Sequence, residues 1–120
     1  MLDFNYKLMR ASGFQTAINL SNEGKFNWIL NEVCYFLQVK KSDVISNSRF
    51  PVFVLARKVI SYILRKEFNI TFKEIGIFLN RDHSNIVYLS QWVEIRLDII
   101  HTYPEEAKLL NYITNKINHE

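Results

Sequence analysis

Five consecutive polar residues near the middle of the chain, Arg81-Asp82-His83-Ser84-Asn85, concentrate groups that could hydrogen-bond to a partner. Arg and His can donate to guanine N7 or O6, Asp can accept from cytosine N4, and a short Ser can reach a base or a phosphate. The run therefore has the chemistry needed to contact the edges of bases in a nucleic-acid duplex.

The same run contains the residue types of a nucleophilic triad, Asp82, His83 and Ser84. Consecutive residues on a helix point about 100° apart, so they cannot form the mutual hydrogen bonds of a triad. The three histidines are far apart in sequence and lack Cys or His partners one helical turn away, which argues against a metal site. Gly76 alone is no phosphate loop, and we find no Walker lysine motif. We expect no enzyme, no ATPase activity, and no bound cofactor or metal.

A helix is predicted just before the polar run. Thr71 stands three residues before Glu74, which is the spacing of a capping box at a helix start. The apolar face of this helix is expected to contain Ile75, Phe78 and Leu79. Asn80 tolerates the left-handed backbone conformation that ends a helix, and Asp82 is a good cap for the next one. The segment thus reads as a helix, a tight turn and a second helix.

The second helix is expected to be long, because an apolar stripe continues far beyond the polar run. The stripe consists of Ile86, Leu89, Val93, Leu97 and Ile100. Only the first turn or two of this helix would then be free for a ligand. Short donors and acceptors at the exposed start of a helix, after a helix and a tight turn, are typical of a recognition helix in the major groove of DNA.

The other elements are also predicted to be helical. Apolar residues at helical spacing indicate helices over Lys25–Val39, from Pro51 to Glu67 or Phe68, and from Tyr103 to the C-terminal end, with a short turn at Ser42–Ile45. We expect an all-α, compact helical bundle of five or six helices, with Ile75, Phe78, Ile86, Leu89 and Val93 in one core. Residues 25–118 would form this domain, and residues 1–24 an N-terminal extension of unknown role.

The composition agrees with a helical protein of one domain. The chain has 120 residues, with nine Phe and six Tyr but only three Gly and two Pro. No apolar run approaches the roughly 18 residues that span a bilayer, and no signal peptide is recognisable, so we expect no membrane association and a cytoplasmic location. Cys34 stands alone and is expected to be a small core residue.

The formal net charge is +3, and the charges are unevenly distributed. Basic residues dominate between Lys40 and Lys66, whereas acidic residues dominate between Glu94 and Glu106. The basic end is the one expected to meet phosphate. Without the polar run, these basic residues would be interpreted as an ordinary solvated helix surface.

The motif residues resemble a known family. Ile75-Gly76 followed by Arg81-Asp82-His83-Ser84-Asn85-Ile86 is similar to the I-G-x-x-F-G-G-R-D-H-T-T-V signature of the C-terminal DNA-binding domain, domain IV, of the bacterial replication initiator DnaA. Upstream, Asp43–Ser46 and Ala56–Tyr62 match the spacing of its D-L-L-S and P-R-Q-M-A-M segments. The resemblance extends from about Trp28 to about Ile117.

This resemblance implies a Trp-repressor-like helix-turn-helix bundle that binds double-stranded DNA and, as a free-standing domain, regulates replication or transcription in a bacterial cell or phage-infected host. The residues it places at the DNA are Arg49, Arg57, Lys58, Phe72, Lys73, Arg81, Asp82, His83, Ser84 and Asn85. The first four polar residues of the run would approach bases, Asn85 would lie near a phosphate, and Lys73 would contact the backbone.

The chain departs from the family pattern in its turn and in the loop before Pro51. Asn80 replaces two glycines, and Leu55 replaces an Arg that enters the minor groove, while Arg49 remains. We therefore expect a preferred site different from the DnaA box. The alternative function is a helical protein-interaction module that has lost DNA binding, with the apolar N-terminal segment docking a protein partner. It would gain support if Arg49, Arg57, Lys58, Lys73 and Arg81 did not share one side with His83. The oligomeric state is left open.

Overall fold

The structure, a computed structural model, describes residues 20–118, and these residues form helices and their connections without any strand. The elements are α3 (Asn22–Leu37), α4 (Lys41–Ile45), α5 (Pro51–Phe68), α6 (Phe72–Leu79), α7 (His83–Ile95), the 3₁₀ segment η1 (Leu97–Thr102) and α8 (Pro104–Asn118). The predicted all-α helical bundle is confirmed. Residues 1–19, most of the expected N-terminal extension, lie outside the described residues.

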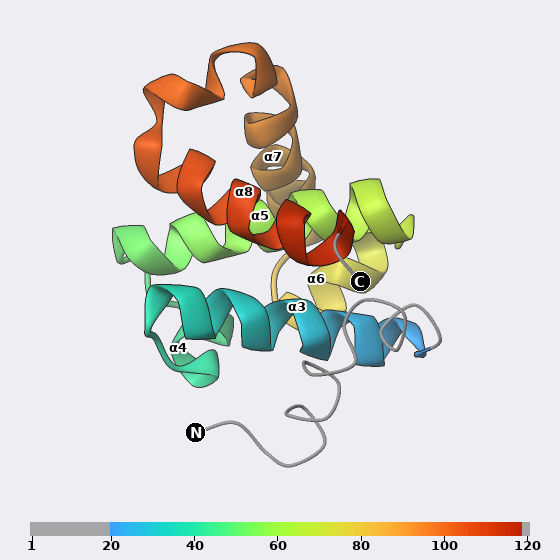
Figure 1. Cartoon of the computed structure of the whole chain (residues 1–120). Coiled ribbons are helices and arrows are strands. Elements are labelled where there is room, and N and C mark those ends of the chain that lie inside the picture. The colour runs from blue at the N-terminus through green and yellow to red at the C-terminus, as the bar shows by residue number, and fades with distance from the viewer. Residues whose placement is uncertain (1–19, 119–120) are drawn as a thin grey trace.

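Helix α5 is the centre of the bundle. It packs against α3, α4, α6, α7 and α8, and α3 and α8 also contact each other (Figure 1). Leu55, Val59 and Ile63 recur at helical spacing on α5 and are all buried. Helices α6 and α7 are therefore both held against this central helix.

Local sequence signals explain most helix ends. The Ser21 hydroxyl accepts a hydrogen bond from the Gly24 amide at 3.1 Å and caps α3, which begins three residues earlier than expected. Pro51 is the first residue of α5, where its missing N–H costs nothing. The residues that follow α3, α5 and α6 are Gln38, Asn69 and Asn80, and each adopts positive φ, which ends the helix.

The predicted length of the second motif helix is wrong. Helix α7 ends at Ile95, and Arg96 leaves helical geometry with φ −102° and ψ 10°. Leu97, expected in the core, is 37% exposed, whereas Ile100 in η1 still packs against the core. The sequence misleads here because the apolar spacing continues through Leu97 and Ile100 although the helix ends at Ile95, so the spacing alone does not show the break.

Aromatic stacking stabilises this break. The Arg96 guanidinium lies 4.4 Å from the centre of the Trp92 ring and donates to the Trp92 carbonyl oxygen at 3.1 Å. Trp92 also meets Tyr103 edge to face, with ring centres 4.9 Å apart. These contacts join the end of α7 to the start of α8, and no Gly or Pro is needed at the bend.

The core of the motif is as predicted, apart from one residue. Ile75, Ile86, Leu89 and Val93 are buried, while Phe78 is partly buried and stacks on Phe26 of α3 with ring centres 5.0 Å apart. Cys34 is buried, as expected, and burial raises the pKa of its thiol to about 11 against an opposing effect of Lys41.

Candidate nucleic-acid interface

The start of α6 is fixed by a cap and by a contact to α3. The Thr71 hydroxyl accepts a hydrogen bond from the Glu74 amide at 3.2 Å, as the capping-box spacing predicts. The reciprocal half of the box does not form, because Glu74 Oε1 accepts from Asn22 Nδ2 at 3.0 Å instead. This bond ties α6 to the first turn of α3 and orients the motif on the bundle.

The turn between the two motif helices is very tight. Asn80 adopts φ 56°, and the Arg81 amide donates to the Gly76 carbonyl oxygen at 2.8 Å. A Cβ atom at Gly76 would lie 2.6 Å from the Arg81 carbonyl oxygen, much closer than real Cβ contacts. Gly76 is thus required by the close approach of the turn, and Asn80 supplies the left-handed residue that ends α6.

The polar run forms the exposed start of α7. Asp82 is the residue before the helix, and its carboxylate makes no capping hydrogen bond. Asp82, His83, Ser84 and Asn85 are all exposed. The first turn of α7 therefore presents a carboxylate, an imidazole, a hydroxyl and an amide to solvent.

An aromatic contact positions the His83 ring. Phe72 of α6 meets it edge to face with ring centres 6.3 Å apart. The Arg65 guanidinium at the end of α5 lies 5.1 Å from the centre of the same Phe72 ring. Arg65 was not expected at the site. Its basic character was visible in the sequence, but only the packing of α5 against α6 reveals that it lies beside the motif.

Arg57 has a structural role rather than the expected DNA contact. It is only 2% exposed. Its Nε donates to the Val44 carbonyl oxygen at 2.7 Å, and its Nη2 donates to the carbonyl oxygens of Ser46 at 3.0 Å and Asp43 at 3.4 Å. Burial, and to a lesser extent Arg81, lowers its pKa to about 10, so it stays charged at neutral pH. The expectation of a DNA contact by Arg57 is therefore wrong, because its side chain is buried and bonded within the bundle.

Lys58 is also engaged elsewhere. Its Nζ lies 3.2 Å from Glu106 Oε2 on α8 and 3.7 Å from the centre of the Trp92 ring. Its side chain is 16% exposed. An ammonium group held by a carboxylate and an aromatic face is a poor candidate for a phosphate contact, so the expectation for Lys58 is revised as well.

Arg81, the first residue of the polar run, and Arg49 lie on the side of the motif that faces α4. An Arg81 Nη2 atom donates to the Ser46 carbonyl oxygen, which is also bonded to Arg57, and its Nη1 donates to Asn80 O at 3.3 Å. In the loop before α5, the Ser46 hydroxyl accepts from the Ser48 amide at 3.2 Å. Arg49 follows in this loop and is exposed.

Two grooves meet at the turn. The α4-side groove is lined by Asn47, Arg49, Val54, Arg57, Arg81, Asp82, Asn85, Tyr88 and Leu89. The α6-side groove is lined by Lys73, Gly76, Ile77, Asn80, Arg81, Asp82 and His83. Arg81 and Asp82 line both, so they form a ridge between the grooves. Of the five basic residues expected on the His83 side, Arg49, Arg57, Lys73 and Arg81 line these grooves, but the buried Arg57 is held by backbone carbonyl oxygens. Lys58 lines neither groove.

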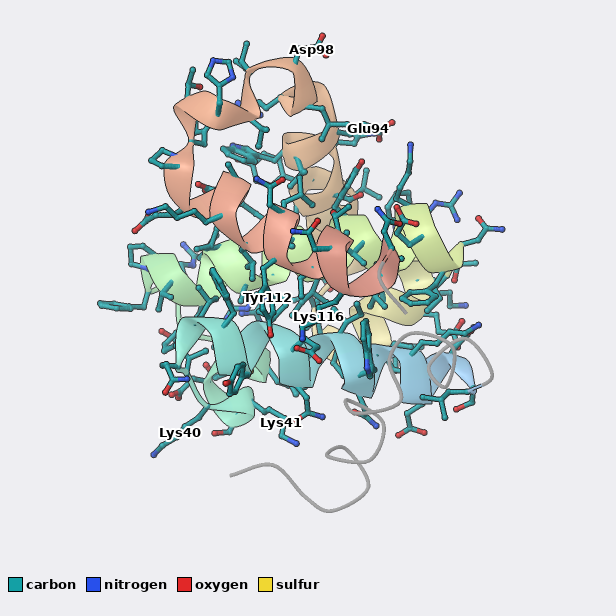
Figure 2. The ribbon with its side chains drawn as sticks, viewed as in Figure 1. Lys40, Lys41, Glu94, Asp98, Tyr112 and Lys116 are labelled. Atoms are coloured by element: carbon teal, nitrogen blue, oxygen red, sulfur yellow. The ribbon has the colours of Figure 1, made fainter. Side chains whose placement is uncertain are left out.

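The overall charge separation follows the sequence. Figure 2 shows Lys40 and Lys41 at the α4 end of the molecule and Glu94 and Asp98 at the far end of α7.

Among the described residues there is no cluster of three or more His, Cys, Asp or Glu side chains that could hold a metal ion. No helix within residues 20–118 has the length and apolar character needed to cross a membrane.

These features define a helix-turn-helix protein: a capped helix, a tight turn closed on a glycine, and a second helix with an exposed polar start. The chain belongs to the family described as the bacterial DnaA protein helix-turn-helix, whose model matches residues 27–93, more than half of the chain. This confirms the resemblance inferred from the motif.

The relatives found are chromosomal replication initiator proteins DnaA. That of Acholeplasma laidlawii is 34% identical over 80 residues, covering 64% of this chain and 18% of the relative. That of Mycoplasma pneumoniae is 34% identical over 59 residues, covering 49% and 13%. DnaA 2 of Chlamydia pneumoniae is 30% identical over 81 residues, covering 68% and 18%. The chain thus spans less than a fifth of the length of these relatives. No solved structure gives a significant match.

Proposed function

We propose that this chain binds double-stranded DNA in a sequence-specific manner, with the first turn of α7 in the major groove. The observation that supports this most strongly is the exposure of four consecutive polar residues at the start of that helix, beside two grooves that contain basic residues. The printed name of the relatives, replication initiator, and the helix-turn-helix family agree with this proposal.

We assign each side chain of the site to base edges, to phosphates or to a positioning role, according to its reach and its existing contacts. Asp82, His83 and Ser84 face the base edges, and Asn85 lies at the edge of the α4-side groove near the backbone. Phosphate contacts come from the exposed residues Arg49, Lys73 and Arg65. Phe72 orients His83, and Arg81 adds positive charge from a position fixed by Ser46.

We further propose that the chain acts by binding rather than by catalysis, as a regulator of replication or transcription without ATPase activity. The sequence contains no Walker motif to hold a nucleotide. We propose a cytoplasmic location in a bacterial cell or phage-infected host, where the DNA is. A protein partner docking on the N-terminal segment is compatible with this function.

The competing function is a protein-interaction module without DNA binding. This function is supported by the burial of Arg57 and by the ion pair of Lys58 with Glu106, since both reduce the positive charge available at the surface. It is less favoured because Arg49, Lys73 and Arg81 still line the grooves beside His83, and α7 keeps its exposed polar start.

Selection of bound duplexes from a random library with the full 120-residue chain tests the proposal. We expect one enriched sequence, with binding that weakens steeply as salt increases, because phosphate contacts release counterions. A parallel selection with His83→Ala should enrich a less defined sequence. If the wild-type chain enriches no sequence and retains no duplex at low salt, the proposal is wrong and the interaction module becomes the better description.

A further inference from the structure

Ile77 is an exposed aliphatic side chain in the middle of the candidate interface. It is 70% exposed, although it lies on α6 between the buried residues Ile75 and Leu79. Burying such a side chain on an interface is favourable, at about 25 cal/mol per Å² of apolar surface removed from water. Single exposed aliphatic residues are common on protein surfaces, so its surroundings must decide whether it has a role.

The surroundings of Ile77 are those of the proposed DNA contact. It lines the α6-side groove together with His83, Lys73 and Asn80. Lys73 lies one turn before it on the same exposed face of α6, and the tight turn brings His83 to the same groove. In this groove the aliphatic side chain of Ile77 lies among polar and charged residues that can bind phosphates and bases.

The chemistry of the major groove offers one apolar group, the 5-methyl of thymine. We propose, on the basis of the proposed function, that Ile77 contacts a thymine methyl group next to the base pair that His83 reads, and so contributes to sequence choice. Ile95, another exposed aliphatic residue, is 75% exposed but lies at the opposite end of α7, away from both grooves. It provides a matched control.

The experiment truncates the Ile77 side chain and, separately, removes single methyl groups from the DNA. Each thymine of the selected duplex is replaced singly by deoxyuridine, which removes only the methyl group, and affinities are measured for the full wild-type chain, Ile77→Ala and Ile95→Ala. At one thymine, we expect removal of the methyl group to lower the affinity of the wild-type chain about fourfold. This corresponds to about 0.8 kcal/mol, the value for burying one methylene-sized group. Ile95→Ala should show the same loss.

Ile77→Ala should bind the thymine duplex several-fold more weakly and bind the thymine and deoxyuridine duplexes equally at that position. Alanine favours helices, and circular dichroism will verify that the variant stays folded. The inference is overturned if Ile77→Ala keeps the wild-type discrimination at every thymine, if no thymine is discriminated, or if the selected site contains none. In these cases the wild-type chain still binds a preferred duplex, so the proposed function survives; a wild-type chain that binds no duplex refutes both.

Discussion

Arg57 and Arg81 donate hydrogen bonds to the same acceptor, the carbonyl oxygen of Ser46. Arg57 belongs to the central helix α5, whereas Arg81 belongs to the turn of the motif. The carbonyl oxygen follows α4, so the contact joins three parts of the chain at the edge of the candidate interface. Two like charges at one oxygen repel each other, which contributes to the lowered pKa of Arg57. The arrangement is stable because Arg57 also donates hydrogen bonds to the carbonyl oxygens of Val44 and Asp43.

We expect Arg57→Ala to destabilise the domain by about 2–3 kcal/mol, because it leaves buried carbonyl groups without their charged donor. Urea unfolding followed by circular dichroism measures this. Arg49→Ala, which removes an exposed Arg from the adjoining loop, is the control and should change stability by less than about 0.5 kcal/mol. Equal stabilities of the two variants would contradict the structural role of Arg57.

We expect Gly76→Ala to destabilise the domain by roughly 1–3 kcal/mol, since the new methyl group would press on the backbone oxygen of Arg81 and force the turn to move. It should also weaken binding to the selected duplex, because the start of α7 moves with the turn. Ile77→Ala, at the next position, is the control for stability. A Gly76→Ala variant with wild-type stability and affinity would show that the turn can adapt without cost.

We expect the Cys34 thiol to react slowly in the folded protein. Burial raises its pKa to about 11, so the reactive thiolate is scarce at pH 8. The folded pKa lies above the unfolded value, so this effect stabilises the protein below pH 9 and is lost as the pH increases toward 11. Modification by a thiol reagent should be about a hundredfold slower in buffer than in urea, from the shift of the pKa alone. Similar rates in both solvents would place Cys34 at the surface.

Most of the fold was predictable because local chemistry determines the helix ends. The cap at Thr71, the proline at Pro51 and the left-handed Asn80 all act within a few residues. The end of α7 was not predictable, because it depends on Arg96 stacking on Trp92 and on the contact of Trp92 with Tyr103. These residues lie close together in the sequence, but their types alone do not show that the helix ends there instead of continuing.

The candidate site was predictable in its centre but not at its edges. The positions of Asp82 and His83 follow from the motif itself, whereas the roles of Arg57, Lys58 and Arg65 depend on contacts of α5 with other elements. A helix with many basic residues gives no indication of which charge is buried, which is paired and which is free. Only the packing of α5 against α4, α6 and α8 separates these cases.

We expect Lys73→Ala to weaken duplex binding on every sequence and to reduce the slope of log affinity against log salt by about one, as for one lost phosphate contact. Lys58→Ala is the control, because its ammonium group is held by Glu106 and Trp92. It should leave the salt slope unchanged, although loss of these contacts can lower stability. If Lys58→Ala flattens the slope and Lys73→Ala does not, the two lysines have been assigned the wrong way round.

We expect His83→Ala to weaken binding to the selected site by roughly 1–3 kcal/mol and binding to a scrambled duplex by much less. This is the binding free energy that one good base contact contributes. His83 is exposed at the first position of α7, so its removal should not affect folding. Phe72→Leu is an informative companion, since it removes the ring that meets His83 edge to face and should reproduce part of the specific loss. Titrations of both variants on the two duplexes measure these effects. Equal losses of His83→Ala on both duplexes would mean that His83 contacts only the backbone, and base reading would then have to be assigned to Asp82 and Ser84.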